Sequence, residues 1–177
     1  MIGAGGAGKT TVALELGRIL ALPVVHLDTL YWLPGWIPRT TGEWEALQRA
    51  ALAGDTWIAD GNFPGTMDFR LGRADTIVFL DLPRLLCLWR ALYRRRRLRG
   101  QARPDLPPGC VEGRIDRGFV AFLSEVWRFP HEGRPRLLGL LARYEEGRDV
   151  VVLRSRAEVT RFLDRVRGAS SSSPSSG

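Results

Sequence analysis

Short apolar runs along the chain alternate with longer segments in which apolar residues recur every three or four positions. The short runs predict buried strands, and the periodic segments predict amphipathic helices. We expect strands at residues 23–28, 57–61, 75–81 and 149–153. We expect helices at about residues 11–21, 40–53, 83–99, 114–129, 135–146 and 157–166. This alternation favours an α/β fold in which helices cover both faces of a parallel sheet.

Two of the predicted helices carry clear start signals. Thr40 and Glu43 have the spacing of a capping box, and Gly54 follows the end of that helix. Pro83 suits the first turn of the next helix, where its missing N–H would have no partner. This helix carries large apolar residues on one face, as is typical of a helix that packs on a core. These residues are Leu85, Leu88, Trp89 and Leu92.

The length of 177 residues suits one domain with a substantial core, which we place at residues 1–168. Residues 100–113 are rich in Pro and Gly, and we assign 95–113 as a short arginine-rich lid. The Ser-rich segment 169–177 is predicted to be a disordered tail, because it cannot bury a core. Met1 and Ile2 alone precede the glycine-rich segment at Gly3, so we expect a truncated first strand, from a misplaced start or a trimmed chain.

The formal net charge of +7 favours anionic partners, nucleotides and nucleic acids alike. The two cysteines follow neither a zinc-binding nor a disulfide spacing, which favours a reducing compartment. The longest apolar stretch, residues 76–89, is interrupted by Asp81, Pro83 and Arg84, so we predict no membrane span. No signal peptide precedes Gly3, and we therefore expect a cytoplasmic protein without a membrane partner.

Lys9 is the single lysine among 26 basic residues. It lies in the segment 3–10, Gly-Ala-Gly-Gly-Ala-Gly-Lys-Thr, which has the spacing of a P-loop (Walker A motif). In such a loop backbone N–H groups surround phosphate oxygens, and a compact ammonium reaches the β- and γ-phosphates where a forked guanidinium does not fit. Thr10 is placed to bind Mg²⁺, and Thr11 opens a helix whose N-terminus favours anions. The sequence thus predicts ATP and Mg²⁺ as cofactors, with nucleotide contacts from Gly3, Gly5, Gly6, Ala7, Gly8, Lys9, Thr10 and Thr11.

Acidic residues end three of the predicted strands: Asp28, Asp60 and Asp81. Ligands of parallel α/β sheets bind beyond the carboxyl ends of the strands, which makes these acids candidate site residues. Asp60 is the candidate for a second Mg²⁺ ligand, with a turn-forming role as the alternative. Asp28 is a candidate for accepting a proton from an acceptor hydroxyl or for binding its polar groups, with a cap or loop role as the alternative. We interpret His26 as a packing residue.

The segment Asp60-Gly61-Asn62-Phe63-Pro64 resembles the Asp-Gly-Phe-Pro-Arg segment of adenylate kinase-like nucleoside monophosphate kinases, with an asparagine inserted and Gly65 in place of the arginine. Further segments narrow the resemblance: His26-Leu27-Asp28, Trp32-x-x-Gly35-Trp36, residues 57–62, Leu86-Cys87-Leu88-Trp89-Arg90, Arg103-Pro104-Asp105 and residues 152–156. Over residues 2–167 the chain is similar to the adenylate kinase-like P-loop proteins that are labelled DNA topology modulation proteins. The fold of that family implies a kinase, and its label implies DNA.

The resemblance also implies roles for several arginines. Arg90 would stack on the base of ATP, and Arg94 would neutralise the transferring phosphate. Arg70 is a candidate for binding the anion of an acceptor, and Arg154 lies in a loop similar to the one that lines the adenine. Because Gly65 stands where that family has an arginine, one side chain that would bind the acceptor's phosphate is missing. This weakens the case for a nucleoside monophosphate as acceptor.

Trp32 and Trp36 lie where an acceptor pocket is expected, and aromatic walls there would suit a planar substrate. The alternative is that both rings cover the core. The arginine run at residues 94–97 and 99 has three open interpretations: catalytic lid arginines, a solvated face and a nucleic-acid patch. Three arginines of the segment after the lid are further candidates for phosphate contact: Arg128, Arg134 and Arg136.

Together these features predict an ATP-dependent phosphotransferase that moves the γ-phosphoryl group to a small acceptor, which could be nucleotide-like. Lys9, Arg94 and Asp28 would be catalytic, Thr10 and Asp60 would hold Mg²⁺, and Asp28, Trp36 and Arg70 would bind the acceptor. The alternative is an ATP-binding, nucleic-acid-associated protein without small-molecule kinase activity.

Overall fold

A computed structural model describes residues 1–101, 106–111, 113, 115–144 and 146–172. The strands are β1 (Ile2–Gly3), β2 (Val24–His26), β3 (Trp32–Leu33), β4 (Ile37–Pro38), β5 (Ile58–Asp60), β6 (Thr76–Leu80) and β7 (Asp149–Leu153). The helices are α1 (Lys9–Leu20), α2 (Leu27–Tyr31), α3 (Thr41–Ala51), η1 (Pro64–Thr66), α4 (Met67–Leu71), α5 (Arg84–Arg97), α6 (Arg117–Arg128), α7 (Gly133–Ala142) and α8 (Arg156–Ser172).

The central strands are parallel. β1, β6 and β7 form one sheet in the order β1-β6-β7, and β2 pairs with β5 in a second. The backbone of Met1 links the two, because its amino group donates to the Ala59 carbonyl at 2.8 Å and its carbonyl accepts from Gly61 N–H at 3.3 Å. These bonds place β1 between β5 and β6, so the spatial order is β2-β5-β1-β6-β7. β1 pairs only with Phe79 and Leu80 of the five-residue β6.

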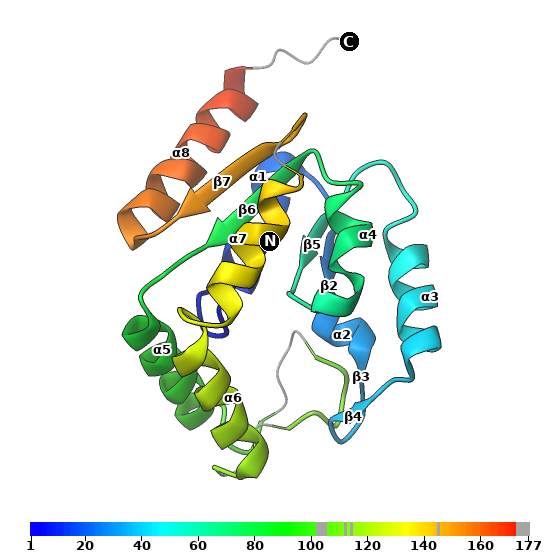
Figure 1. Ribbon diagram of the computed structural model, residues 1–177, viewed down its shortest axis with the longest axis vertical. Coiled ribbons are helices and arrows are strands. Elements are labelled where there is room, and N and C mark those ends of the chain that lie inside the picture. The colour runs from blue at the N-terminus through cyan, green and yellow to red at the C-terminus, as the bar shows by residue number, and fades with distance from the viewer. Residues whose placement is uncertain (102–105, 112, 114, 145, 173–177) are drawn as a thin grey trace.

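Helices cover both faces of this sheet, as the sequence pattern predicts. α1 and α8 pack against each other on one face, and α7 crosses the other face in front of β6 (Figure 1). The core lies between these layers, and Phe79 and Leu80 at its centre have no exposed surface. Leu16 of α1, Leu141 of α7 and Phe162 of α8 belong to the same buried cluster. The expected parallel sheet flanked by helices is confirmed.

Several local predictions agree with the structure. β7 has the predicted bounds, 149–153, and both hydrogen bonds of the Thr40–Glu43 capping box are present. The predicted buried face of α5 is wrong for three of its four residues, because Leu85, Trp89 and Leu92 are 66%, 56% and 45% exposed. The fourth, Leu88, is partly buried and packs against the core, as predicted. The small residues on another face of α5, Cys87 and Ala91, are buried instead. Small residues let this helix approach a neighbouring backbone more closely than leucines would.

The predicted lid begins as helix, because α5 runs to Arg97. Its residues 106–111 cross to the β3–β4 hairpin, where Gly35 N–H donates to the Gly109 carbonyl at 3.3 Å (Figure 1). The motif at residues 103–105 lies outside the described residues. At the other end, α8 continues to Ser172, so residues 169–172 are helical where we expected disorder, and 173–177 lie outside the described part. Within the described residues, none of the helices combines the length and apolar character that a membrane crossing requires.

Candidate active site

The loop between β1 and α1 forms the floor of the candidate site. Gly6 and Gly8 have φ angles of 77° and 94°, in the left-handed region that glycine adopts without strain. A Cβ atom on Gly6 would collide with the backbone carbonyl of Cys87 in α5, so this position requires glycine for space as well. The loop delivers Lys9 as the first residue of α1, and a helix N-terminus of this kind favours bound anions.

The Lys9 ammonium folds back onto the loop. Its Nζ donates to the carbonyls of Gly3 at 2.9 Å and Ala4 at 3.0 Å. Burial lowers the pKa of Lys9, and the negative charges of Asp60 and Asp28 oppose that change. Arg94 also acts on this pKa, in the lowering direction. The fold therefore brings Lys9, Asp28, Asp60 and Arg94 within electrostatic reach of one another, from four separate segments of the chain.

Asp60 is the most connected acid of the site. The Thr10 hydroxyl donates to Asp60 Oδ2 at 2.7 Å, and His26 Nδ1 lies 3.2 Å from the same oxygen. Burial alone would raise the pKa of Asp60, but the hydrogen bonds from His26 and Thr10 and the charge of Lys9 outweigh it and lower the pKa. The carboxylate is therefore ionised and lies beside a hydroxyl. Such a pair of hard oxygen ligands suits Mg²⁺.

His26 has a different position from the one we expected. It lies opposite Asp60 in the register between β2 and β5, and its ring faces the carboxylate. Our interpretation as a packing residue was based on the strand alone. The sequence does not show which residue of β5 would lie opposite His26.

Asn62 holds the loop in a way that the sequence analysis missed. It is the single asparagine of the chain, as Lys9 is its single lysine. Its Oδ1 accepts from Gly3 N–H at 3.0 Å, and its Nδ2 donates to the Gly3 carbonyl at 2.8 Å. Lys9 and Asn62 thus share one carbonyl oxygen. The only sequence signal was the position of Asn62 directly after Asp60-Gly61.

Arg70 lies deeper than an acceptor-binding residue would. Its side chain is buried, with 4% of the residue exposed, and burial lowers its pKa to about 10. Its Nη1 donates to Gln48 Oε1 at 2.8 Å and to the Thr66 hydroxyl at 2.9 Å, and its Nη2 donates to the carbonyls of Gly61 and Asn62. An acceptor would contact this guanidinium only if these bonds broke. The structure therefore does not bring Arg70 to the open side of the site.

The arginine side chains of α5 point toward different parts of the molecule. Arg90 Nη1 donates to the Ala7 carbonyl at 2.9 Å, so this side chain lies on the glycine-rich loop. Arg94 is half-buried, and its positive charge lowers the pKa of Lys9. Arg95 instead faces α6, where its Nη2 donates to Asp116 at 2.9 Å. Arg96 and Arg97 are both exposed. At most the first part of the run can therefore serve a ligand on the loop.

Asp81 ties the segment after the lid to the sheet. Arg134 Nε donates to both of its carboxylate oxygens, at 3.0 and 2.8 Å, and Arg154 Nε lies 3.9 Å from one of them. These groups line a cavity of about 330 Å³ that also includes Ala4 of the glycine-rich loop. Arg154 thus lines the same cavity as Ala4 of the loop. Arg134 is engaged by Asp81 instead of lying open for phosphate.

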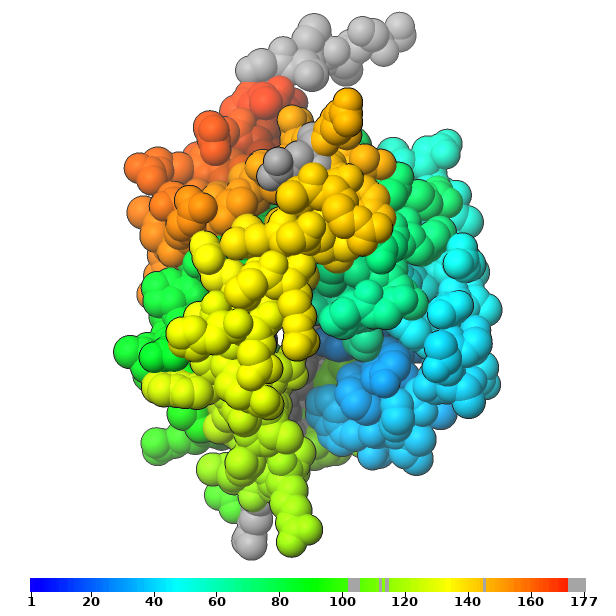
Figure 2. Space-filling view, viewed as in Figure 1, coloured from blue at the N-terminus to red at the C-terminus, as the bar shows by residue number. Residues whose placement is uncertain are grey.

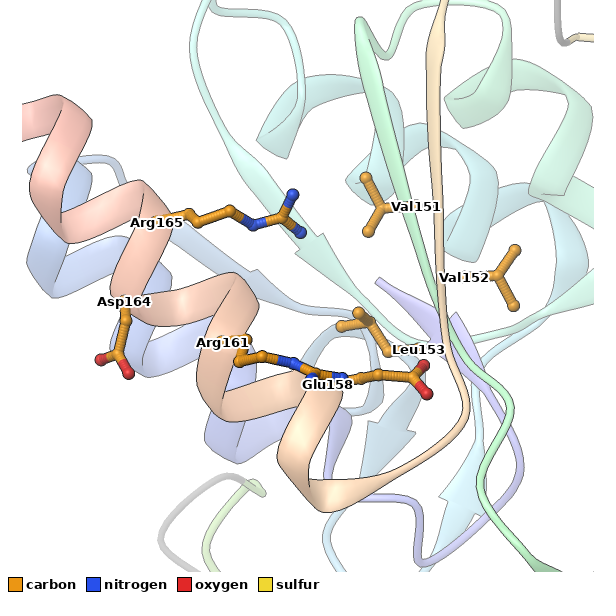
Figure 3. Close-up of a pocket in the computed structure, with 7 residues that line it drawn as sticks. All are labelled: Val151, Val152, Leu153, Glu158, Arg161, Asp164 and Arg165. Atoms are coloured by element: carbon orange, nitrogen blue, oxygen red, sulfur yellow. The ribbon is translucent and has the colours of Figure 1, made fainter.

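A larger hollow, of about 600 Å³, lies between β7 and α8. Figure 3 shows Arg165 extending from α8 toward Val151, while Asp164 points away from the strand. This groove contains none of the predicted site residues. Figure 2 shows a recess between the surface of α6 and α7 (yellow) and that of residues 27–38 (blue).

The β3–β4 hairpin carries Trp32 and Trp36, with ring centroids 5.7 Å apart. Trp36 Nε1 donates to the Val111 carbonyl at 3.1 Å, so the lid segment contacts the hairpin. Asp28 lies in the first turn of the short helix α2, directly before these aromatic residues. Asp28 and Trp36 therefore belong to one continuous stretch of chain, residues 28–36.

No family model matches the chain, and no curated protein matches it. The resemblance to the family labelled DNA topology modulation proteins therefore stays a prediction. Among solved structures, the chain is similar to an unliganded crystal structure of a sugar kinase from Janibacter sp., at 15% identity and a TM-score of 0.42. The match covers 94% of this chain and 87% of that one. A likeness at this level says nothing about reaction or substrate, so the proposals below rest on the site itself.

Proposed function

We propose that this chain is an ATP-dependent phosphotransferase that moves the γ-phosphoryl group to a small acceptor. The observation that supports this proposal most is the contact of the Thr10 hydroxyl with Asp60 at 2.7 Å, beside the ammonium of Lys9. A hydroxyl and a carboxylate that meet beneath a glycine-rich helix N-terminus provide the oxygen ligands and the positive charge that phosphoryl transfer needs.

The donor nucleotide would lie along the loop. Backbone N–H groups of residues 5–11 would surround its phosphates, because the N–H of Gly3 is held by Asn62. Lys9 would turn from the Gly3 and Ala4 carbonyls to the β- and γ-phosphates. Arg90 and Arg154 would contact the base end. Thr10 and Asp60 would hold Mg²⁺, which supplies charge neutralisation between the β- and γ-phosphates when bound.

The acceptor would lie between Asp28 and the hairpin at Trp36. The Asp28 carboxylate would take the proton of the attacking hydroxyl, and Arg94 would stabilise the negative charge that spreads over the transferring phosphoryl group. Contact of residues 106–111 with the hairpin would exclude water from the reacting groups and limit ATP hydrolysis.

The test is ADP formation from Mg-ATP in the presence of a panel of small acceptors. Lys9→Ala is expected to lower acceptor-stimulated turnover by about 10²-fold or more while the fold is kept, because the charge on the phosphates is lost. Lys9→Arg should fail similarly, since a guanidinium does not fit the loop. Arg18→Ala removes an exposed charge from the far part of α1 and is the matched control that should keep full activity. Preserved turnover in Lys9→Ala would refute the assignment.

A second candidate function is ATP-linked nucleic-acid binding. The exposed arginines Arg96 and Arg97 and the net charge of +7 favour it. Such binding would weaken steeply and linearly on a log–log plot against salt. Affinity for DNA at physiological salt that Arg96→Ala and Arg97→Ala together abolish, with no acceptor-stimulated turnover, would favour this candidate over the kinase.

A further inference from the structure

The carboxylate of Asp60 is held by side chains from two different elements. The Thr10 hydroxyl, in the first turn of α1, donates to Asp60 Oδ2 at 2.7 Å. His26 Nδ1, at the end of β2, lies 3.2 Å from the same oxygen. Because an ionised carboxylate only accepts hydrogen bonds, the ring nitrogen that faces it carries a proton and donates. Asp60 Oδ2 therefore accepts two hydrogen bonds, while Oδ1 accepts none from the described residues.

The register of two strands fixes the contact between His26 and Asp60. The two residues lie opposite each other where β2 and β5 pair in parallel, and each is the last residue of its strand. Their side chains are 19% and 6% exposed, so the hydrogen bond is largely shielded from water. A shielded hydrogen bond to a charged group is stronger than an exposed one. The backbone pairing therefore keeps the imidazole ring beside the carboxylate.

The proposed Mg²⁺ site offers few protein ligands. Among the residues that the structure describes, no three His, Cys, Asp or Glu side chains cluster to form a metal site. Thr10 and Asp60 would thus share the ion with the phosphates of the nucleotide, as is usual for Mg²⁺. The terminal torsion of an aspartate is broad, so a carboxylate held by one bond alone can turn. With a single carboxylate at the site, its orientation decides how well Oδ1 binds the ion or one of its water molecules.

Building on the proposed function, we propose that His26 is the positioning residue of this Mg²⁺ site. Its Nδ1–H and the Thr10 hydroxyl hold Asp60 Oδ2 from two elements, so the carboxylate does not turn and Oδ1 remains the oxygen for the ion. His26 itself does not bind Mg²⁺, because magnesium prefers oxygen ligands and Nδ1 carries a proton. Removal of an outer partner of this kind weakens metal binding by about 10–100-fold.

The test measures affinity for a non-hydrolysable ATP analogue by isothermal titration, at a series of Mg²⁺ concentrations and in EDTA. His26→Phe keeps a flat ring of similar size and removes the donor. We expect the gain in affinity that Mg²⁺ provides to fall by about tenfold or more, with the affinity in EDTA unchanged because Lys9 and the loop are intact. An unchanged gain would overturn the inference. An equal loss in EDTA would overturn it as well, because the loop itself would then be damaged.

Two amide variants test the position of the donor and keep the inference falsifiable if His26→Phe does not fold. His26→Asn places an N–H near the position of Nδ1, whereas His26→Gln places it one bond further out. We expect His26→Asn to keep most of the gain from Mg²⁺ and His26→Gln to lose it. Equal behaviour of the two variants would contradict a positioning role. His131 is the other histidine of the chain and is exposed, so His131→Phe is the matched control that should keep the full gain.

A double variant shows whether His26 acts through Asp60. In the Asp60→Asn background, His26→Phe should reduce the remaining gain by less than about twofold, because the carboxylate that it holds is gone. Equal losses in both backgrounds would overturn the inference. In turnover, the Mg²⁺ concentration for half-maximal rate should rise about tenfold in His26→Phe, while kcat at saturating Mg²⁺ stays within about threefold of the wild type. A fall in kcat alone would contradict a role in holding the ion.

Failure of the proposed function looks different from failure of this inference. If the wild type gains affinity from Mg²⁺ but phosphorylates no acceptor, the kinase proposal fails, and the binding series still decides the role of His26. If the wild type gains nothing from Mg²⁺, the Mg²⁺ site itself is refuted, and the positioning role of His26 is refuted with it.

Discussion

Asn62 offers the sharpest test of how the loop is held. Its side chain makes two hydrogen bonds to the backbone of Gly3, at 3.0 and 2.8 Å. Asn62→Ala removes both. The Gly3 N–H lies in a buried residue and would lose its acceptor, while the Gly3 carbonyl would keep the bond from Lys9. The two groups should therefore respond unequally.

The expected loss of stability follows from this asymmetry. A buried donor left without a partner costs about 1–3 kcal/mol, and loss of an ordinary hydrogen bond costs about 0.5–1.5 kcal/mol. We expect Asn62→Ala to lower the free energy of unfolding by about 3 kcal/mol, which is about 6–12 °C in Tm for a chain of this length. Asn62→Asp keeps an oxygen for the Gly3 N–H and should lose about half as much.

Urea unfolding followed by circular dichroism measures these differences, and isothermal titration with Mg-ATP measures the effect on the loop. Nucleotide affinity should fall in Asn62→Ala even below its unfolding temperature, because the loop loses its fixed anchor. A stability within about 0.5 kcal/mol of the wild type, which is the size of one weak hydrogen bond, would refute the reasoning. It would mean that the two hydrogen bonds of Asn62 do not stabilise the loop.

Three further predictions concern stability, pH and the acceptor side. Because the pKa of Asp60 is lowered in the folded state, its ionised form stabilises the fold above the unfolded value of about 4, and that contribution is lost as the pH falls through the folded-state pKa. The wild type should therefore exceed Asp60→Asn in unfolding free energy by the largest amount at pH 7, and this difference should shrink below about pH 4. A difference that does not change with pH would contradict a lowered pKa of Asp60. Thr40→Ala removes the capping box of α3 and should cost about 1 kcal/mol in thermal unfolding without changing turnover. Arg70→Met should lower Tm because it strands Gln48 and two carbonyls, whereas a raised acceptor KM at unchanged Tm would restore the acceptor-binding role.

Local patterns predicted the longer helices and the strands β2, β5, β6 and β7, because these elements depend on neighbouring residues. They did not predict α2, the β3–β4 hairpin, η1 or α4. The capping box of Thr40 and Glu43 and the bounds of β7 both need only a few adjacent positions. The helix α5 shows the limit of this reasoning. Of the predicted apolar face only Leu88 packs against the core, and the fully buried residues are Cys87 and Ala91, because α5 packs closely on the glycine-rich loop. Nothing in the local sequence states what a helix will pack against.

The sequence by itself determined the glycine-rich loop and its lysine, because a backbone that curls around phosphate needs glycines and an ammonium at fixed spacing. It also determined that Asp60 ends β5 and that Asp81 directly follows β6, whereas Asp28, expected at the end of a strand, lies in α2. Only the tertiary structure decided which groups meet there. His26 faces Asp60 because β2 and β5 pair in one register, and Asn62 reaches Gly3 across 59 positions of sequence. Arg70 is drawn into the interior because Gln48, on a different helix, offers it an acceptor. Such contacts depend on how strands align and helices pack, and these are set by the burial of the whole core.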